Sequence, residues 1–192
     1  MSFVVGALVG GLAVGALLGG SLTRLERLGL RELRLLFVAV VIQALGSLLL
    51  TGPVYATSMV VSLGLASAFV VRNPQLPGKA LVVGGLALNA LVIVANGAMP
   101  VSADAARTAG ISLASIRHDP RHSLLDGHAH LTWLADRIPL GLPWQPQVLS
   151  IGDVLVAAGV GLLVAAGMLR GTAQPPRIPV RKAPAELERL LH

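Results

Sequence analysis

The residues best suited to chemistry gather in one stretch, residues 97–149, between two apolar runs. Four of the chain's histidines lie there: His118, His122, His128 and His130. Imidazole beside carboxylates is typical of zinc, nickel, copper or iron sites. His118 and His122 would share a face of a continuous helix, but Pro120 lies between them, and no HExxH signature is present. The pattern favours polar surface residues and leaves a metal site at these histidines as the alternative.

A second set of polar residues comes from the ends of the apolar runs and from the stretch between them: Asn89, Asn96, His128, Asp136 and Asp153. Asn89 and Asn96 are spaced to share a helix face, and a polar side chain in hydrocarbon needs a polar partner. An interhelical hydrogen bond or a helix end would explain both asparagines. The alternative is that they line a polar site.

Ser150 and Asp153 have the spacing of a helix capping box, which places the acid near the positive end of the helix dipole. The alternative for Asp153 is an ion pair with Arg137 or a loop histidine, or a role in proton relay. No GxSxG motif is present, so a hydrolytic triad is not expected. No cofactor is implied.

The elements that position these residues are membrane helices. The chain has 192 residues, of which 54% are hydrophobic and 12% charged, against about 25% charged in soluble domains. Apolar runs cover about 2–20, 36–51, 57–71, 80–96 and 151–169. We therefore expect an all-α integral membrane protein, a bundle of five transmembrane helices. The second and third runs fall short of the roughly 20 residues that cross a bilayer, so a hairpin entering only partway is the alternative.

The distribution of basic residues predicts the orientation. Net charge is +6, and 13 of the 15 basic residues are arginine, mostly in short segments between apolar runs. That division orients a membrane protein and argues against nucleic-acid binding. It places the N-terminus and loop 97–149 outside, and a Pro/Arg-rich tail, 171–192, in the cytoplasm. The arginine-rich, Ala/Gly/Leu/Val-rich composition suggests a bacterial multi-pass protein of the plasma membrane, with the lipid bilayer as its first partner.

Glycine spacing makes the first apolar run suitable for close helix packing. Gly11, Gly15 and Gly19 recur at every fourth residue, with Gly6 and Gly10 beside them. The favoured interpretation is packing within the chain, and the alternative is a homo-oligomer or a membrane protein partner. Residues 21–35 then have the pattern of an amphipathic helix on the cytoplasmic surface, or of a solvated connector.

The long external segment should be a folded helical cap on the outer surface. Leucine and isoleucine spacing predicts a helix over about 122–137, with one apolar face: Leu124, Leu131, Leu134 and Ile138. Another short helix is expected within 103–114. Both tryptophans, Trp133 and Trp144, lie in this segment, and tryptophan favours the membrane–water boundary.

Three motifs carry a resemblance to a known family. They are NGAMPV at residues 96–101, LADRIPL at 134–140 and SIGDVL at 150–155. In combination they resemble a family of small bacterial multi-spanning membrane proteins known only as a domain of unknown function. The resemblance covers about residues 1–170 and implies a bacterial plasma membrane and a functional emphasis on the external loop. It carries over no catalytic role.

Three functions compete on the sequence alone. The first is a non-enzymatic membrane protein whose external loop binds a partner protein or lipid. The second is a metal-handling or small-solute transport component that uses the loop histidines and Asp153. The third is a membrane-embedded enzyme on a lipid-linked substrate, with Asp136, Asp153 and a histidine as acid and base. The first needs only the topology and the cap, so it is preferred.

Overall fold

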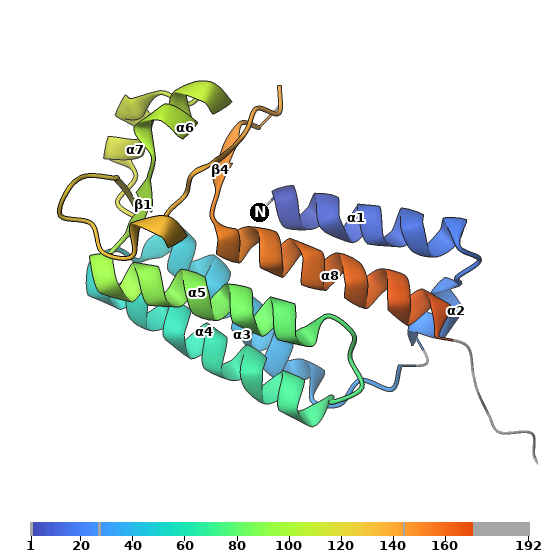
Figure 1. Ribbon diagram of the computed structural model, residues 1–192. Helices are drawn as coiled ribbons and strands as arrows, with labels where there is room; N and C mark the ends of the chain where they lie inside the picture. The colour runs from blue at the N-terminus through green and yellow to red at the C-terminus, as the bar shows by residue number, and fades with distance from the viewer. Residues whose placement is uncertain (1, 27, 144, 171–192) are drawn as a thin grey trace, which may run out of the picture.

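The computed structural model describes residues 2–26, 28–143 and 145–170. Long apolar helices lie side by side, and a smaller mixed unit, the cap, covers one end of them (Figure 1). The helices outside the cap are α1 Ser2–Leu17, α2 Leu22–Glu26, α3 Leu33–Leu49, α4 Gly52–Arg72, α5 Lys79–Asn96 and α8 Ile151–Leu169. Trp144 and the tail expected at 171–192 lie outside the described residues.

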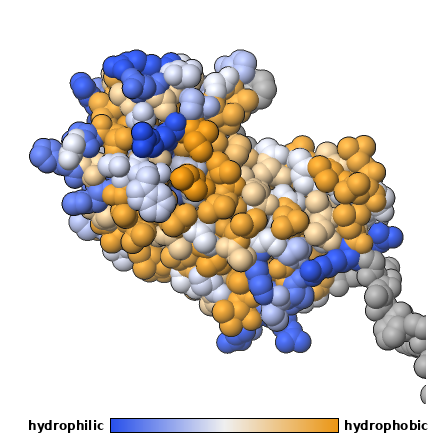
Figure 2. All heavy atoms as spheres, viewed as in Figure 1, coloured by the Kyte–Doolittle hydropathy of each residue, from blue (hydrophilic) through white to orange (hydrophobic). Residues whose placement is uncertain are grey.

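In the described part of the chain, three helices are long and apolar enough to cross a membrane: α4, α5 and α8. Helices α1 and α3 are apolar but shorter, with 16 and 17 residues, or about 24–26 Å of helix. Helix α4 begins before the expected residue 57, because Pro53 fits its first turn. Large apolar side chains such as Phe37 and Leu48 are at least 70% exposed, and Figure 2 shows apolar surface between polar ends. These features indicate a membrane protein.

The long helices form a row in which each packs mainly on its neighbours, in the order α1, α8, α5, α4, α3. Glycine permits the close contacts. A Cβ at Gly11 would lie 2.7 Å from the carbonyl oxygen of Gly161, and one at Gly15 would lie 2.7 Å from the sulfur of Met168. These two glycines of the first helix therefore serve packing within the chain, whereas Gly6 and Gly10 face open space.

The segment between α1 and α3 is not one amphipathic helix. Among its described residues, only those of α2 are helical, and Leu25 and Leu28 pack close to Gly167 of α8. The following connector is tied to the far end of α4: the Arg31 amide donates to Asn73 Oδ1 at 2.8 Å, and Asn73 Nδ2 donates to the Arg31 carbonyl oxygen at 2.9 Å. Of the two alternatives for residues 21–35, the continuous amphipathic helix is wrong, because these tertiary contacts turn the chain.

The cap combines short helices with short strands. Its elements are β1 Met99–Val101, α6 Ala103–Ala109, α7 Leu113–His118, β2 His122–Leu124, the 3-10 turn η1 Thr132–Leu134, β3 Ile138–Leu140 and β4 Gln147–Leu149. Strands β1 and β2 pair in parallel, and β3 and β4 pair antiparallel. Helix α6 confirms the short helix expected within 103–114, and it begins with Ser102 accepting from the Ala105 amide.

The helix predicted over 122–137 is wrong, and so is a purely helical cap. The backbone of this segment is used instead for pairing with β1 and β4, and Leu131 has a positive φ that ends any helix there. Leu134 is buried among Tyr55 and Val92 of the bundle, whereas Ile138 is 41% exposed in β3. Leu134 and Ile138 therefore do not lie on one apolar helix face.

Candidate functional site

Asp136 is fixed between the cap and the helices by its backbone and its neighbours. Its amide donates to the carbonyl oxygen of Pro100 at 2.9 Å, and its carbonyl accepts from the Ser102 amide at 2.8 Å. Leu134, two residues earlier, is anchored in the core of the bundle. Asp136 is only 5% exposed, and its Oδ1 has no hydrogen-bond partner among the described residues. A buried acceptor without a donor is unfavourable, so its position needs an explanation.

Asp153 is held by a capping box at the start of α8. Ser150 Oγ accepts from the Asp153 amide at 3.0 Å, and Asp153 Oδ2 accepts from the Ser150 amide at 3.0 Å. The predicted capping box is therefore confirmed. A second helix joins this network: Asn89 Nδ2 donates to Asp153 Oδ1 at 2.8 Å, and Ser150 Oγ donates to Asn89 Oδ1 at 2.8 Å. Both carboxylate oxygens of Asp153 are thus occupied by the protein itself.

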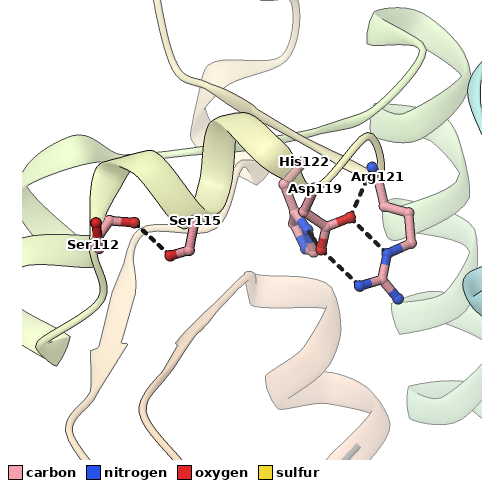
Figure 3. A network of polar contacts seen from close by, with 5 residues as sticks. All are labelled: Ser112, Ser115, Asp119, Arg121 and His122. Carbon is pink, nitrogen blue, oxygen red and sulfur yellow. Dashed lines mark hydrogen bonds and ion pairs between the residues drawn. The ribbon is translucent and has the colours of Figure 1, made fainter.

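A compact ion pair follows α7. Figure 3 shows the Asp119 carboxylate between the Arg121 guanidinium and the His122 ring. Arg121 Nε donates to Asp119 Oδ1 at 2.8 Å and its Nη2 donates to Oδ2 at 2.6 Å, while His122 Nδ1 lies 3.0 Å from the same Oδ2. The hydrogen bonds from Arg121 lower the pKa of Asp119 far below its usual value. Asp119 is therefore an anion throughout the physiological range.

These groups border two cavities at the junction of cap and helices. The first has a volume of about 290 Å³ and reaches between α3, α4, α5 and α8, and the second, of about 600 Å³, extends into the cap. Four residues line both: Arg121, His122, Asp136 and Asp153. They form the polar wall where the two spaces approach one another. We call the first space the junction cavity.

Burial controls the acidity of Asp136. Removal from water raises the pKa of its carboxyl well above the usual value, and the negative charge of Asp153 adds to this in the same direction. Two carboxyl groups that share a low-dielectric space are typical of binding and catalytic sites, although structural networks produce the same shifts. Here both oxygens of Asp153 accept hydrogen bonds from the protein, whereas Asp136 Oδ1 has no partner among the described residues, so we take Asp136 as the candidate ligand contact.

The structure brings together three of the five residues in the polar set. Asn89, Asp136 and Asp153 line the junction cavity. Asn96 lies at the end of α5 instead, where its Nδ2 donates to the carbonyl oxygens of Val92 and His130. The side chain of His128 is exposed on the cap surface, outside both cavity linings. Of the two asparagines, one makes the interhelical bond and the other the helix-end bond.

The histidines do not converge. Helix α7 ends at His118, whose Nδ1 lies 2.7 Å from the carbonyl oxygen of Ala114, so His118 and His122 do not share a helix face. Of the four, only His122 borders the cavities. Across residues 2–26, 28–143 and 145–170, no group of three or more histidine, cysteine or acidic side chains could hold a metal ion.

Sequence reasoning missed several residues that line the junction cavity. Gln43 and Ser62 lie near the middle of α3 and α4, and Ser62 Oγ donates to the Ala39 carbonyl oxygen at 3.0 Å. Their signal was a polar residue at the centre of an apolar run. Tyr55 and Arg121 also line the cavity. Arg121 carried a weaker signal, an arginine close to Asp119 in a loop whose arginines and acids are balanced.

The comparisons with known proteins identify the family. The sequence matches the family of unknown function DUF5317 over residues 27–165, which is most of the chain. The chain belongs to the DUF5317 family. It is also 34% identical over 113 residues to an uncharacterized protein of Thermotoga maritima, a match that covers 58% of this chain and 64% of that protein. It thus spans just under two thirds of the relative's length. No solved structure matches.

In this DUF5317 protein, the three motifs that carry the family resemblance meet at the junction cavity. Met99 and Asp136 come from the first two motifs, and Asp153 comes from the third. Gly152 of the third motif is needed because a Cβ there would overlap Asn89 Oδ1. The motifs are far apart in the sequence, and pairing of β1 with the Asp136 backbone and of α5 with α8 brings them together.

Proposed function

We propose that this DUF5317 protein crosses the membrane five times, with its N-terminus and cap outside and its C-terminus in the cytoplasm. The direction of the helices supports this topology, because α1, α4 and α8 run away from the cap end and α3 and α5 run toward it (Figure 1). Basic residues at the opposite end give further support: Arg24, Arg31, Arg34, Arg72, Lys79 and Arg170. Short segments rich in arginine and lysine are retained in the cytoplasm.

Reporter fusions test the topology. An alkaline phosphatase fused after Lys79 should be inactive, and one fused after Arg107 should be active, because only the second would lie outside. A green fluorescent protein fused at the same two positions is the matched control and should give the reverse pattern. The same compartment at both positions would contradict the proposal.

We further propose that the protein is a non-enzymatic binding protein that holds a small polar ligand, or the polar head of a lipid, in the junction cavity. The observation that carries this proposal is Asp136 Oδ1, which is buried at the cavity wall without a hydrogen-bond donor. A native interior rarely leaves such an atom unpaired unless a water, an ion or a ligand completes it. The cavity also combines apolar side chains with several polar groups, as ligand sites do.

The hydrogen bonds favour a binding function over a catalytic one. Ser150 Oγ is a nucleophile by type, but it donates to Asn89 and accepts from the Asp153 amide. Each carboxylate oxygen of Asp153 already accepts a hydrogen bond, from Asn89 or from the Ser150 amide. Asp119 and Arg121 neutralise each other. These groups stabilise the walls of the cavity, and Asp136 is left to contact a ligand.

The binding proposal can be tested by blocking the cavity. Ala90 lines it and is 5% exposed, whereas its neighbour Leu91 is 52% exposed on the outside of α5. We expect native mass spectrometry of protein released from lipid nanodiscs to find a retained molecule on the wild type and on Leu91→Trp, but not on Ala90→Trp. If Ala90→Trp does not fold, Ser62→Leu narrows the cavity from α4. Equal retention by every folded variant, or none by the wild type, would contradict the proposal.

One observation favours a second candidate, an enzyme acting on a lipid-linked substrate. Asp136, Asp153 and His122 all line the junction cavity, so side chains of the types used as acid and base share one space. The two candidates differ in what happens to the retained molecule. A binding protein should release it unchanged after incubation, whereas an enzyme should convert it, and His122→Gln should abolish the conversion while leaving the molecule bound.

A further inference from the structure

The charges around Asp136 favour a cationic partner. The charged groups that line the two cavities beside it are Asp153 from α8 and the Asp119–Arg121 pair from the cap, with His122 next to that pair. Arg121 offsets one of the two acids. The wall therefore carries an excess of negative charge whenever Asp136 is ionised. A neutral ligand would leave that charge uncompensated in a space of low dielectric.

When Asp136 is ionised, the missing partner of its Oδ1 is a hydrogen-bond donor. A bare metal ion fits poorly, because no group of three or more acidic or histidine side chains that could hold one occurs in the described ranges. Asp153 already accepts one hydrogen bond on each oxygen, from Asn89 and from the Ser150 amide, so its negative charge is partly compensated by the protein. An N–H group that brings its own positive charge satisfies both the orphan acceptor and the charge balance.

The rest of the junction cavity indicates what the charged group is attached to. Beyond the polar wall, α4 and α5 contribute a group of apolar side chains to the lining: Met59, Leu63, Leu86, Ala90 and Ile93. The cavity also reaches Gln43 and Ser62, near the middle of their helices, so it extends from the cap into the region that we assign to the bilayer. A ligand with a charged end and an apolar arm matches this shape.

We propose that the junction cavity binds a protonated primary amine, with its ammonium group donating to Asp136 Oδ1 and an apolar arm lying against α4 and α5. This rests on the proposed binding function and deepens it by naming the ligand class. The same chemistry has two sources, the head group of an aminophospholipid and a soluble alkylamine. The experiment below has one arm for each.

The soluble arm uses hexylamine as the probe and 1-hexanol as its neutral match. Unfolding temperatures of the full chain in detergent are measured against each compound at constant pH. For the wild type we expect hexylammonium to bind about tenfold more tightly than hexanol, the factor expected of one charge-assisted hydrogen bond. Asp136→Asn should lose this preference. Asp104→Asn should keep this preference, because the Asp104 side chain is 93% exposed on α6 and lines neither cavity.

The lipid arm uses nanodiscs of phosphatidylglycerol alone or mixed equally with phosphatidylethanolamine. We expect native mass spectrometry to find one phosphatidylethanolamine retained by the wild type and by Asp104→Asn, with retention at least severalfold lower for Asp136→Asn. If Asp136→Asn does not fold, the proposal is tested by the wild type alone. It should then prefer hexylammonium over hexanol, or phosphatidylethanolamine over phosphatidylglycerol.

The outcomes separate this inference from the function on which it rests. An Asp136-dependent preference for the ammonium compound in either arm supports the proposal and identifies the source. No preference in either arm overturns it. If the wild type still retains another molecule that Ala90→Trp loses, the binding function stands and only the ammonium assignment fails. If nothing is retained, both fail.

Discussion

Replacing Asp136 by asparagine should change how the stability of the protein depends on pH. Burial, with a smaller contribution from Asp153, raises the pKa of the Asp136 carboxyl in the folded protein, whereas the unfolded chain restores its ordinary value near 4. The folded state therefore binds the proton more tightly than the unfolded state. This group contributes most to stability below the unfolded pKa, and that contribution is lost as pH rises through the folded pKa.

The size of the effect follows from proton linkage. Between the unfolded and folded pKa values of Asp136, the free energy of unfolding of the wild type should fall by about 1.4 kcal/mol per pH unit relative to Asp136→Asn. Asp119 acts in the opposite direction, because Arg121 lowers its pKa, so its contribution is present above its unfolded pKa and is lost as pH falls through the folded one. Since Asp119 is the same in both proteins, it cancels in the difference.

The assay is unfolding of the purified protein in detergent, without added amine, at intervals from pH 4 to pH 8. The informative quantity is the wild-type stability minus that of Asp136→Asn, which should decline with rising pH and then level off above the folded pKa. Asp104→Asn, an exposed carboxylate paired with Arg107, should give a nearly flat difference. A flat difference for Asp136→Asn as well, or one that rises with pH, would refute the claim that Asp136 is buried and unpartnered.

Three further predictions concern packing. Gly152→Ala should destabilise the bundle by about 1–3 kcal/mol, because its methyl group would overlap the Asn89 side chain of α5. Gly127→Ala, where a methyl group meets open space, should be neutral in the same unfolding assay. Gly11→Leu should prevent α1 from packing on α8, whereas Gly10→Leu should fold normally. If the open face of α1 at Gly10 joins two copies of the protein, Gly10→Leu should abolish the dimer crosslink that the wild type gives in membranes. An unchanged crosslink would exclude that face as the interface. Asn73→Ala should cost about 1–3 kcal/mol, because three hydrogen bonds of a fully buried amide are lost, and an unchanged unfolding temperature would contradict that assignment.

The membrane helices could be read from the sequence because they depend on local composition. Sustained apolar runs without charge must be helical in lipid, since each backbone group has to find its partner within the segment. The expected run 151–169 matches α8 in full, and 80–96 misses α5 by one residue. The capping box at Ser150 and Asp153 was also predictable, because it joins residues three apart.

The cap could not be read in the same way. Its strands are three residues long, and each exists because of a partner far along the chain, as when His122 pairs with Met99. Leucine spacing over 122–137 suggested a helix, yet Leu134 is buried by Tyr55 and Val92, residues that no local pattern connects to it. Long-range backbone pairing overrode the periodicity.

The sequence by itself indicated a membrane protein, the positions of its long apolar helices and the charged residues of the segment between α5 and α8. Only the tertiary structure decided that Asp136, rather than a histidine cluster, is the unsatisfied group, and that Asn89 and Asp153 share a cavity with it. The physical reason is that helix formation is settled within a few residues. Whether a carboxylate is buried, paired or left without a donor depends on neighbours contributed by several segments at once.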